Sequence, residues 1–150
     1  MKRTTTPLLS ALFLCLLLGA PAAHADYLCS YQARISGRDK FNSKGTPVVS
    51  GINKSSVAAA IRQDRANYHM WNVRDDEDTG DCAFASTKNR ERLQNMLLRG
   101  NISQRAMRAV YEGNPLIKVD VYTDHVDVRL VDEDGDLIQP VQPRRRSRVD

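Results

Sequence analysis

The spacing of apolar positions changes twice along this chain. Over residues 27–36 they occupy every second position, as in a strand that is buried on one face. Within three stretches of residues 57–111 they recur at intervals of three and four, the spacing of amphipathic helices. From residue 116 the alternation returns. We therefore predict a strand, then helices, then paired strands. The inner face of the first strand would carry Tyr27, Cys29, Tyr31, Ala33 and Ile35.

The first helix is predicted to begin after one of three residues that favour the N-cap position, namely Asn53, Ser55 or Ser56. It is expected to end near Tyr68 or His69, because the apolar period stops there. The segment before it is rich in glycine, serine, asparagine and proline, and is predicted to be a loop. The apolar face of this helix would consist of Val57, Ile61 and Tyr68.

Two further helices are predicted in the middle of the chain. The second starts at Ser86 or Thr87 and ends before Gly100, a residue type that favours the position after a helix. The third is capped by Ser103 and stopped by Gly113. Between the first and second helices the sequence has no regular period, so a polar loop is expected there.

The C-terminal third is predicted to form an antiparallel meander. Two alternating stretches are separated by a turn at residues 123–125. Asp134 and Gly135 are typical of a two-residue hairpin, so a short third strand should follow, confined to an edge by Pro140 and Pro143. Segregated strands and helices indicate an α+β fold. We expect a small single domain with two to three helices packed on a short antiparallel sheet, which the first strand joins.

The N-terminus has the three parts of a secretory signal peptide. A basic start precedes an apolar run over residues 8–18, which is shorter than the roughly 20 residues that a membrane span needs. Ala23 and Ala25 then occupy the two positions that a signal peptidase reads. A periplasmic or secreted protein is therefore expected. The predicted division is a signal peptide at residues 1–25, a globular domain at 26–141 and a disordered basic tail at 142–150.

The cysteine count agrees with export. Removal of the signal peptide takes away Cys15 and leaves Cys29 and Cys82. An oxidising compartment favours a disulfide between them. Closing a loop of about 50 residues would stabilise the fold by about 4 kcal/mol on the chain-entropy model. Two free buried thiols are the alternative.

Charge gives little support for a nucleic-acid partner. The formal net charge is +4, but basic residues concentrate in the signal peptide and in the tail, where Arg144, Arg145, Arg146 and Arg148 lie. The body of the chain is nearly neutral, so nucleic-acid binding is unlikely on this ground. The tail could contact anionic lipid or glycan, or remain solvated. No later apolar stretch is long enough for a membrane span.

The densest aromatic cluster lies just after the first helix. Tyr68, His69 and Trp71, the only tryptophan, fall within four residues. Such side chains often anchor interfaces between proteins. The alternative is that Trp71 belongs to the core and packs near the disulfide.

An acidic loop follows the aromatic cluster directly. Repulsion between carboxylates this dense calls for neutralisation, by Ca²⁺, by a basic partner surface, or by Arg74 and counterions. The ligand order and closing glutamate of an EF-hand are missing. A second acidic stretch at residues 132–136 is explained by its hairpin turn. The carboxylates of the first loop, which we count with the aromatic cluster as the candidate binding site, are Asp75, Asp76, Glu77, Asp78 and Asp81.

Candidate catalytic chemistry is sparse. No nucleophile-elbow, zinc-protease or cysteine–histidine motif is present. His69 could pair with an aspartate of the acidic loop and with Ser55 or Ser86 to form a small hydrolase, whereas His125 lies in a turn. We predict no catalytic site, no cofactor and no metal ion.

The sequence therefore favours a small exported binding protein with another protein as its partner. An inhibitor or immunity protein that acts on an envelope enzyme through its acidic and aromatic loop would combine these features. Two alternatives stay open. One is a periplasmic hydrolase that uses His69 with a nearby aspartate, and the other is a structural envelope-associated protein with a basic tail.

Overall fold

A computed structural model describes residues 24–138. The predicted basic tail and all but the last two residues of the predicted signal peptide lie outside this range. Within it, no helix has the length and the apolar character to cross a membrane.

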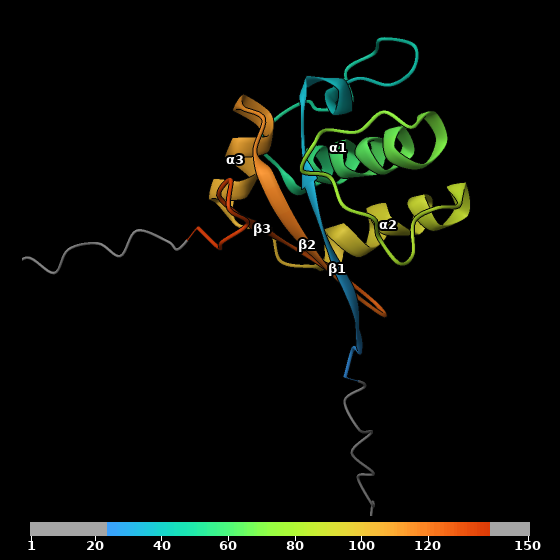
Figure 1. Cartoon of the computed structure of the whole chain (residues 1–150), viewed down its shortest axis with the longest axis vertical. Coiled ribbons are helices and arrows are strands. Elements are labelled where there is room, and N and C mark those ends of the chain that lie inside the picture. Colours follow the sequence, from blue (N-terminus) through green and yellow to red (C-terminus); the bar gives the residue numbers. More distant parts are fainter. Residues whose placement is uncertain (1–23, 139–150) are drawn as a thin grey trace, which may run out of the picture.

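The three strands form one antiparallel sheet in the order β1-β2-β3 (Figure 1). They are β1 (Tyr27–Arg34), β2 (Leu116–Tyr122) and β3 (Val126–Leu130). The first strand joins the C-terminal pair, as predicted, by lying beside β2 with Tyr31 opposite Val119. The α+β class is therefore confirmed.

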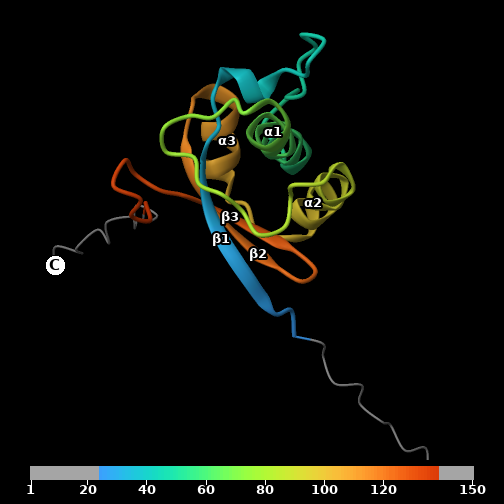
Figure 2. The same ribbon diagram turned by 45° about the vertical axis from the view of Figure 1, so that its right-hand side comes forward.

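Three α-helices cover one face of this sheet (Figure 2). They are α1 (Lys54–Ala66), α2 (Thr87–Arg99) and α3 (Gln104–Glu112), and a short 3-10 turn, η1 (Gly37–Lys40), precedes them. The side chains of Asn53, Ser86 and Ser103 each accept a hydrogen bond from a backbone N–H in the first turn of the helix that they cap. The predicted starts of all three helices are confirmed.

Gly100 follows α2 for a reason other than the predicted one. Its φ is −78°, so the left-handed turn that favours glycine after a helix is absent. A Cβ atom at this position would lie 1.7 Å from the carbonyl oxygen of Val126. Close packing of the helix end against β3 therefore requires glycine here.

The core lies between the helices and the inner face of the sheet. Tyr31, Ala33 and Ile35 are buried there, as the alternation predicts. Tyr27 is not, because the register slips between Tyr27 and Cys29 and leaves Tyr27 56% exposed. From the helices, the core receives Val57, Ile61, Leu93, Leu97 and Val110.

Both edges of the sheet are hydrogen-bonded to loops. Along β1, the backbone N–H of Thr79 donates to the carbonyl oxygen of Gln32, and the N–H of Gln32 donates to the Thr79 hydroxyl. Along β3, the N–H of Val128 donates to the carbonyl oxygen of Asn101. Beyond β3, the predicted third strand of the meander amounts, in the described chain, to one pairing of Val131 with Leu137.

The disulfide between Cys29 and Cys82 is confirmed, with Cα atoms 6.3 Å apart. It joins β1 to the end of the acidic loop, immediately before α2. The loop is thus held covalently at one end and by the edge of β1 in its middle.

Candidate functional site

The aromatic cluster occupies an irregular continuation of α1. Residues Asn67–Trp71 form a π-helical turn, η2, which ends at Asn72 in the left-handed region with φ 52°. Such wide turns rotate the side chains that follow relative to an ideal helix, and they are frequent at functional sites. Here Tyr68 and His69 are half-buried, whereas Met70 and Trp71 are 54% and 60% exposed.

Beneath this turn lies a buried ionic cluster around Arg65. The Arg65 side chain is fully buried. Its Nε lies 2.7 Å from Oδ2 of Asp64, and its Nη1 lies 3.0 Å from the carbonyl oxygen of Thr79 and 3.4 Å from Oδ2 of Asp81. A buried charge needs such partners, because its loss of hydration is otherwise uncompensated. The acidic loop is therefore held to α1 from inside the protein.

Aromatic rings contact the same guanidinium group. The Arg65 Cζ lies 4.4 Å from the ring centre of Tyr31 and 4.5 Å from that of Tyr68. Arg74 also lies over the Tyr68 ring, at 3.9 Å. Cation–π contacts of this kind are stronger where water is excluded. Tyr68 is thereby held within the fold and is not free to anchor a partner.

Asp81 accepts hydrogen bonds from three directions. Its Oδ2 lies 2.6 Å from Nε2 of His69, and its Oδ1 accepts from the backbone N–H groups of Ala83 and Phe84. Burial alone would raise the pKa of this carboxyl, but the hydrogen bonds from His69 and the two N–H groups outweigh it and lower the pKa. Asp81 is thus an ionised, internal counterion.

The predicted pairing of His69 with an aspartate of the acidic loop is present, with Asp81 as the partner, but neither of the serines considered with it joins this pair. The hydroxyl of Ser86 caps α2 by accepting from the N–H of Asn89. Ser55 lies in the first turn of α1 and His69 beyond its last, so roughly 20 Å of helix separates them. The Asp81–His69 pair therefore acts in the fold as an internal tie.

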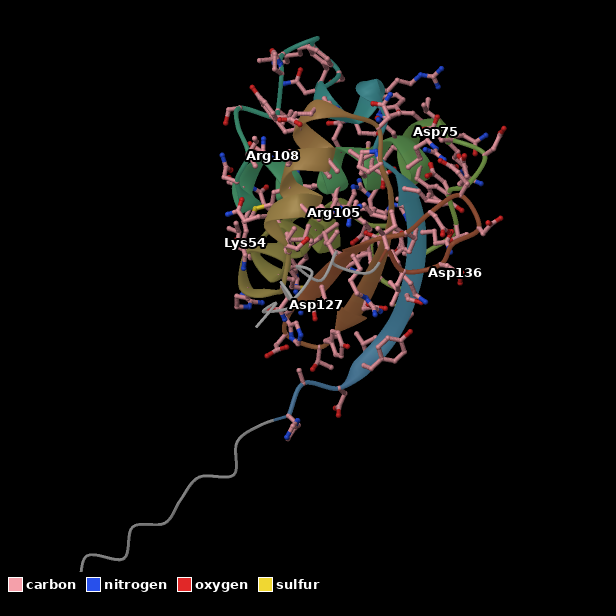
Figure 3. All side chains as sticks on the ribbon, turned by 90° about the vertical axis from the view of Figure 1, so that its left-hand side faces the viewer. Lys54, Asp75, Arg105, Arg108, Asp127 and Asp136 are labelled. Carbon is pink, nitrogen blue, oxygen red and sulfur yellow. A yellow bond between two sulfur atoms is a disulfide. The ribbon has the colours of Figure 1, made fainter. Side chains whose placement is uncertain are left out.

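The two acidic segments of the sequence meet at one arginine. Nη2 of Arg34 lies 2.5 Å from Oε1 of Glu77 and also contacts the carboxylate of Glu133. Figure 3 accordingly shows Asp75 and Asp136 on the same side of the molecule, near β1. The pKa of Glu77 is lowered, chiefly by its hydrogen bond from Arg34.

The carboxylates of the acidic loop are therefore largely neutralised from within. Asp78 accepts hydrogen bonds from the backbone N–H groups of Arg34 and Asp75. Arg34 and Arg65 form the ion pairs, and Arg74, which was expected to do so, stacks on Tyr68 instead. Nowhere in residues 24–138 do three or more acidic, histidine or cysteine side chains gather in a way that could hold a metal ion.

Large apolar side chains are also exposed at this end of the molecule. Trp71, Phe41, Met70 and Val73 are 60%, 47%, 54% and 36% exposed. Trp71 therefore does not pack in the core near the disulfide, and that interpretation was wrong. We call these four residues, together with Arg38, the Trp71 surface.

A hollow of about 450 Å³ opens within the Trp71 surface, between η1 with its following loop and the end of α1. Phe41, Trp71 and Val73 give it apolar walls. Arg38 lies at this hollow and has no hydrogen-bond or ion-pair partner in the described chain. The polar residues that also line it are Asn42, Ser43, Gln63 and Asn67.

The candidate site is thus only partly the one that the sequence indicates. Trp71 and Asp76 are exposed, but Tyr68 and Asp81 are engaged in the fold. Sequence reasoning missed Phe41 and Arg38. The available signal for Phe41 was that it is a large apolar residue in an otherwise polar loop. Such a residue has no apolar neighbours at strand or helix spacing with which it could form a buried face.

Comparison of the chain with protein-family models, with characterised proteins and with solved structures finds no match. Function must therefore be argued from the geometry of the chain itself.

The buried Asp64 carboxyl predicts a specific pH dependence. Burial, only partly offset by Arg65, raises its pKa from 3.8 to about 7. The folded state thus holds this proton to a higher pH than the unfolded chain does, and the free energy of unfolding should fall as the pH rises from about 4 to about 7. This difference in the pKa of Asp64 corresponds to a loss of about 2–4 kcal/mol in the free energy of unfolding. Burial also raises the pKa of Asp39, so this carboxyl contributes to the pH dependence in the same direction.

Urea unfolding at pH 5 and pH 8 measures this effect. Asp64→Asn keeps an acceptor for Arg65 and removes the titration, so most of the difference between the two pH values should disappear. Asp76→Asn, which removes an exposed carboxylate of the same loop, is the matched control. Equal pH dependence in Asp64→Asn and the unmodified protein would contradict the assignment.

Proposed function

We propose that this chain is a small exported binding protein that holds another protein through the Trp71 surface. The observation that supports this most is the exposure of Trp71 together with Phe41 and Val73 around one hollow. Contiguous apolar surface of this kind on a small domain is typical of an interaction site. Tryptophan is also among the residues that most often dominate binding energy.

The surface suggests a partner of different character from the one first expected. Glu77, Asp78 and Asp81 are occupied by Arg34, by backbone N–H groups and by Arg65 with His69, so they offer little to a basic cleft. Trp71 and Phe41 instead offer rings around a hollow, with the unpartnered Arg38 beside them. A partner segment with an apolar side chain and a nearby carboxylate fits this arrangement.

An inhibitor or immunity protein for an envelope enzyme remains the form of this proposal that joins export with binding. The intramolecular disulfide supports an oxidising location. The proposal assigns no catalytic step to the chain.

Replacing Trp71 by alanine should weaken partner binding by about 30-fold or more, corresponding to a loss of about 2–4 kcal/mol for a central aromatic anchor. Thermal stability should change little, because the side chain is largely exposed. A photo-crosslinking residue at Val73 would capture the partner from an extract of the source cells. Since Trp71 is the only tryptophan, its fluorescence then reports binding of the purified partner.

Tyr111→Ala provides the matched control, because Tyr111 is a 44% exposed aromatic residue on α3, outside the Trp71 surface. A crosslinked protein that binds Trp71→Ala and Tyr111→Ala with equal affinity would overturn the proposal. A partner lost only with Trp71→Ala would support it.

A further inference from the structure

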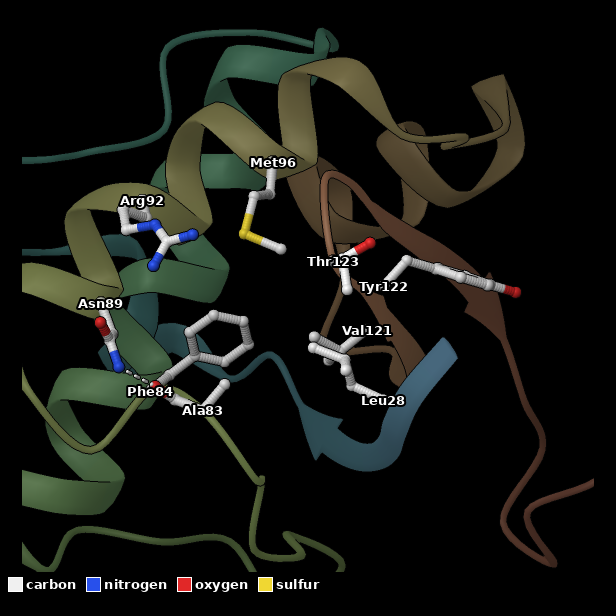
Figure 4. Close-up of a pocket in the computed structure, with 9 residues that line it drawn as sticks. All are labelled: Leu28, Ala83, Phe84, Asn89, Arg92, Met96, Val121, Tyr122 and Thr123. Carbon is white, nitrogen blue, oxygen red and sulfur yellow. Dashed lines mark hydrogen bonds between the residues drawn. The ribbon is translucent and has the colours of Figure 1, made fainter. Parts of the chain in front are cut away.

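A second, smaller hollow lies between α2 and the adjoining ends of β1 and β2, close to the disulfide. It has a volume of about 80 Å³. Phe84, Met96 and Val121, all buried, form its apolar floor. Leu28 and Arg92, both exposed, lie at its rim (Figure 4).

Arg92 differs from the neighbouring arginines of α2. Nη1 of Arg90 donates to the carbonyl oxygens of Phe84 and Ala85, and Arg99 donates to that of Asp124. Arg92 has no hydrogen-bond or ion-pair partner in the described chain. Figure 4 shows its guanidinium group directed toward the side of the hollow that Phe84 and Met96 form.

The positive charge at this rim is reinforced along the helix. Lys88, Arg92 and Arg99 follow one another at intervals of four and seven, so they share one face of α2. Lys88 and Arg92 are exposed and lack a carboxylate partner in residues 24–138. An apolar hollow is thus combined with an unpartnered guanidinium group and a second cation one turn away.

We propose that this hollow is a binding site for a carboxylate that carries a small aliphatic group. A planar guanidinium group pairs with a carboxylate through two parallel hydrogen bonds. A cavity of about 150 Å³ accepts benzene. A hollow of about 80 Å³ therefore has room for three or four carbon atoms against Phe84, Met96 and Val121.

Two sources could supply this chemistry. One is a free branched short-chain carboxylate, and the other is the C-terminal residue of a polypeptide that ends in valine or leucine. Both place an aliphatic group on the apolar floor and a carboxylate at Arg92. The site is independent of the Trp71 surface, since the two hollows share no lining residue.

Methionine methyl groups allow a direct test. Protein expressed from the complete sequence with ¹³C-methyl methionine is titrated with 3-methylbutanoate and followed by NMR. The Met96 methyl signal should shift saturably, because Met96 lines the hollow. The signals of Met107, on the core side of α3, and of Met70, on the Trp71 surface, serve as internal references and should not move.

Both the negative charge of the carboxylate and the aliphatic group of the ligand should be required for binding. The neutral 3-methylbutanamide and the chainless acetate should each bind at least tenfold more weakly than 3-methylbutanoate. Arg92→Gln should weaken 3-methylbutanoate binding about tenfold with little change in the thermal midpoint, because the exposed Arg92 has no hydrogen bond or ion pair to lose in the described chain. Arg38→Gln, which removes another arginine without a hydrogen-bond or ion-pair partner in residues 24–138, is the matched control and should leave the affinity unchanged.

The source is distinguished by a second titration. A Gly-Gly-Leu tripeptide with a free C-terminal carboxylate is compared with the same tripeptide carrying a C-terminal amide. Tighter binding of the free-carboxylate tripeptide than of 3-methylbutanoate would assign the site to a chain end, and the reverse to a small molecule. An unmoved Met96 signal, equal affinity for acid and amide, or unchanged affinity in Arg92→Gln would overturn the proposal.

Discussion

Replacing Arg65 by methionine is expected to lower the free energy of unfolding at pH 8 by about 3–5 kcal/mol, the usual cost of leaving buried charge without its partner. The substitution leaves Asp64 and Asp81 inside the protein without their cation. It also removes the cation between Tyr31 and Tyr68. Urea unfolding measures the change directly. A loss of this size is a large part of the total stability of a small domain.

Two further variants distinguish the effect of the lost positive charge on stability from the effect of the lost side-chain volume. Arg90→Met truncates an arginine that is nearly as buried but donates to carbonyl oxygens and has no carboxylate partner within the described residues, so it should cost less, about 1–3 kcal/mol. Adding Asp64→Asn to Arg65→Met removes one of the two stranded carboxyls and should recover part of the loss. Equal losses for Arg65→Met and Arg90→Met would contradict the ionic explanation.

Removing the disulfide is expected to have an effect of similar size. The bond joins residues 53 positions apart, and closing a loop of that length is worth about 4 kcal/mol on the chain-entropy model. Cys29→Ala combined with Cys82→Ala should therefore lower the free energy of unfolding by about this amount. Chemical denaturation of the double variant beside the oxidised protein measures it.

The reduced parent protein provides the control, because it keeps both side chains and loses only the bond. Reduction and double replacement should destabilise to a similar extent. A change below about 1 kcal/mol in both cases would mean that the unfolded chain already keeps these two segments together.

The fold was predictable because its signals are local. Cap residues such as Ser86 and Ser103 act within one helical turn, and the alternation in the strands reports directly on the buried face. The predicted cleavage of a signal peptide would remove the odd cysteine and leave a single pairing, so the disulfide was predictable as well. The exception within β1, Tyr27, lies beyond a slip of register that alternation alone does not reveal.

The candidate site depends on contacts between distant residues, and these leave no periodic signal. Arg65 joins a tyrosine 34 positions earlier to an aspartate 16 positions later, and Arg34 reaches Glu133 across 99 positions. Without knowledge of these long-range contacts, a dense run of carboxylates in the sequence therefore resembles a solvated or partner-binding loop. Trp71 is the last residue of a π-helical turn that interrupts the helical register, and a regular helical period does not predict its exposure.

The acidic loop that runs along β1 also has a consequence for how the molecule meets its own copies. An open strand edge is a template on which further chains can add by backbone hydrogen bonding, and this leads to aggregation. Thr79 and Asp78 occupy the donors and the acceptor of Gln32 and Arg34 that such a chain would need. The disulfide at Cys82 anchors the same loop three residues further on. Protection of this edge against strand addition is thereby tied to the oxidised state of the protein.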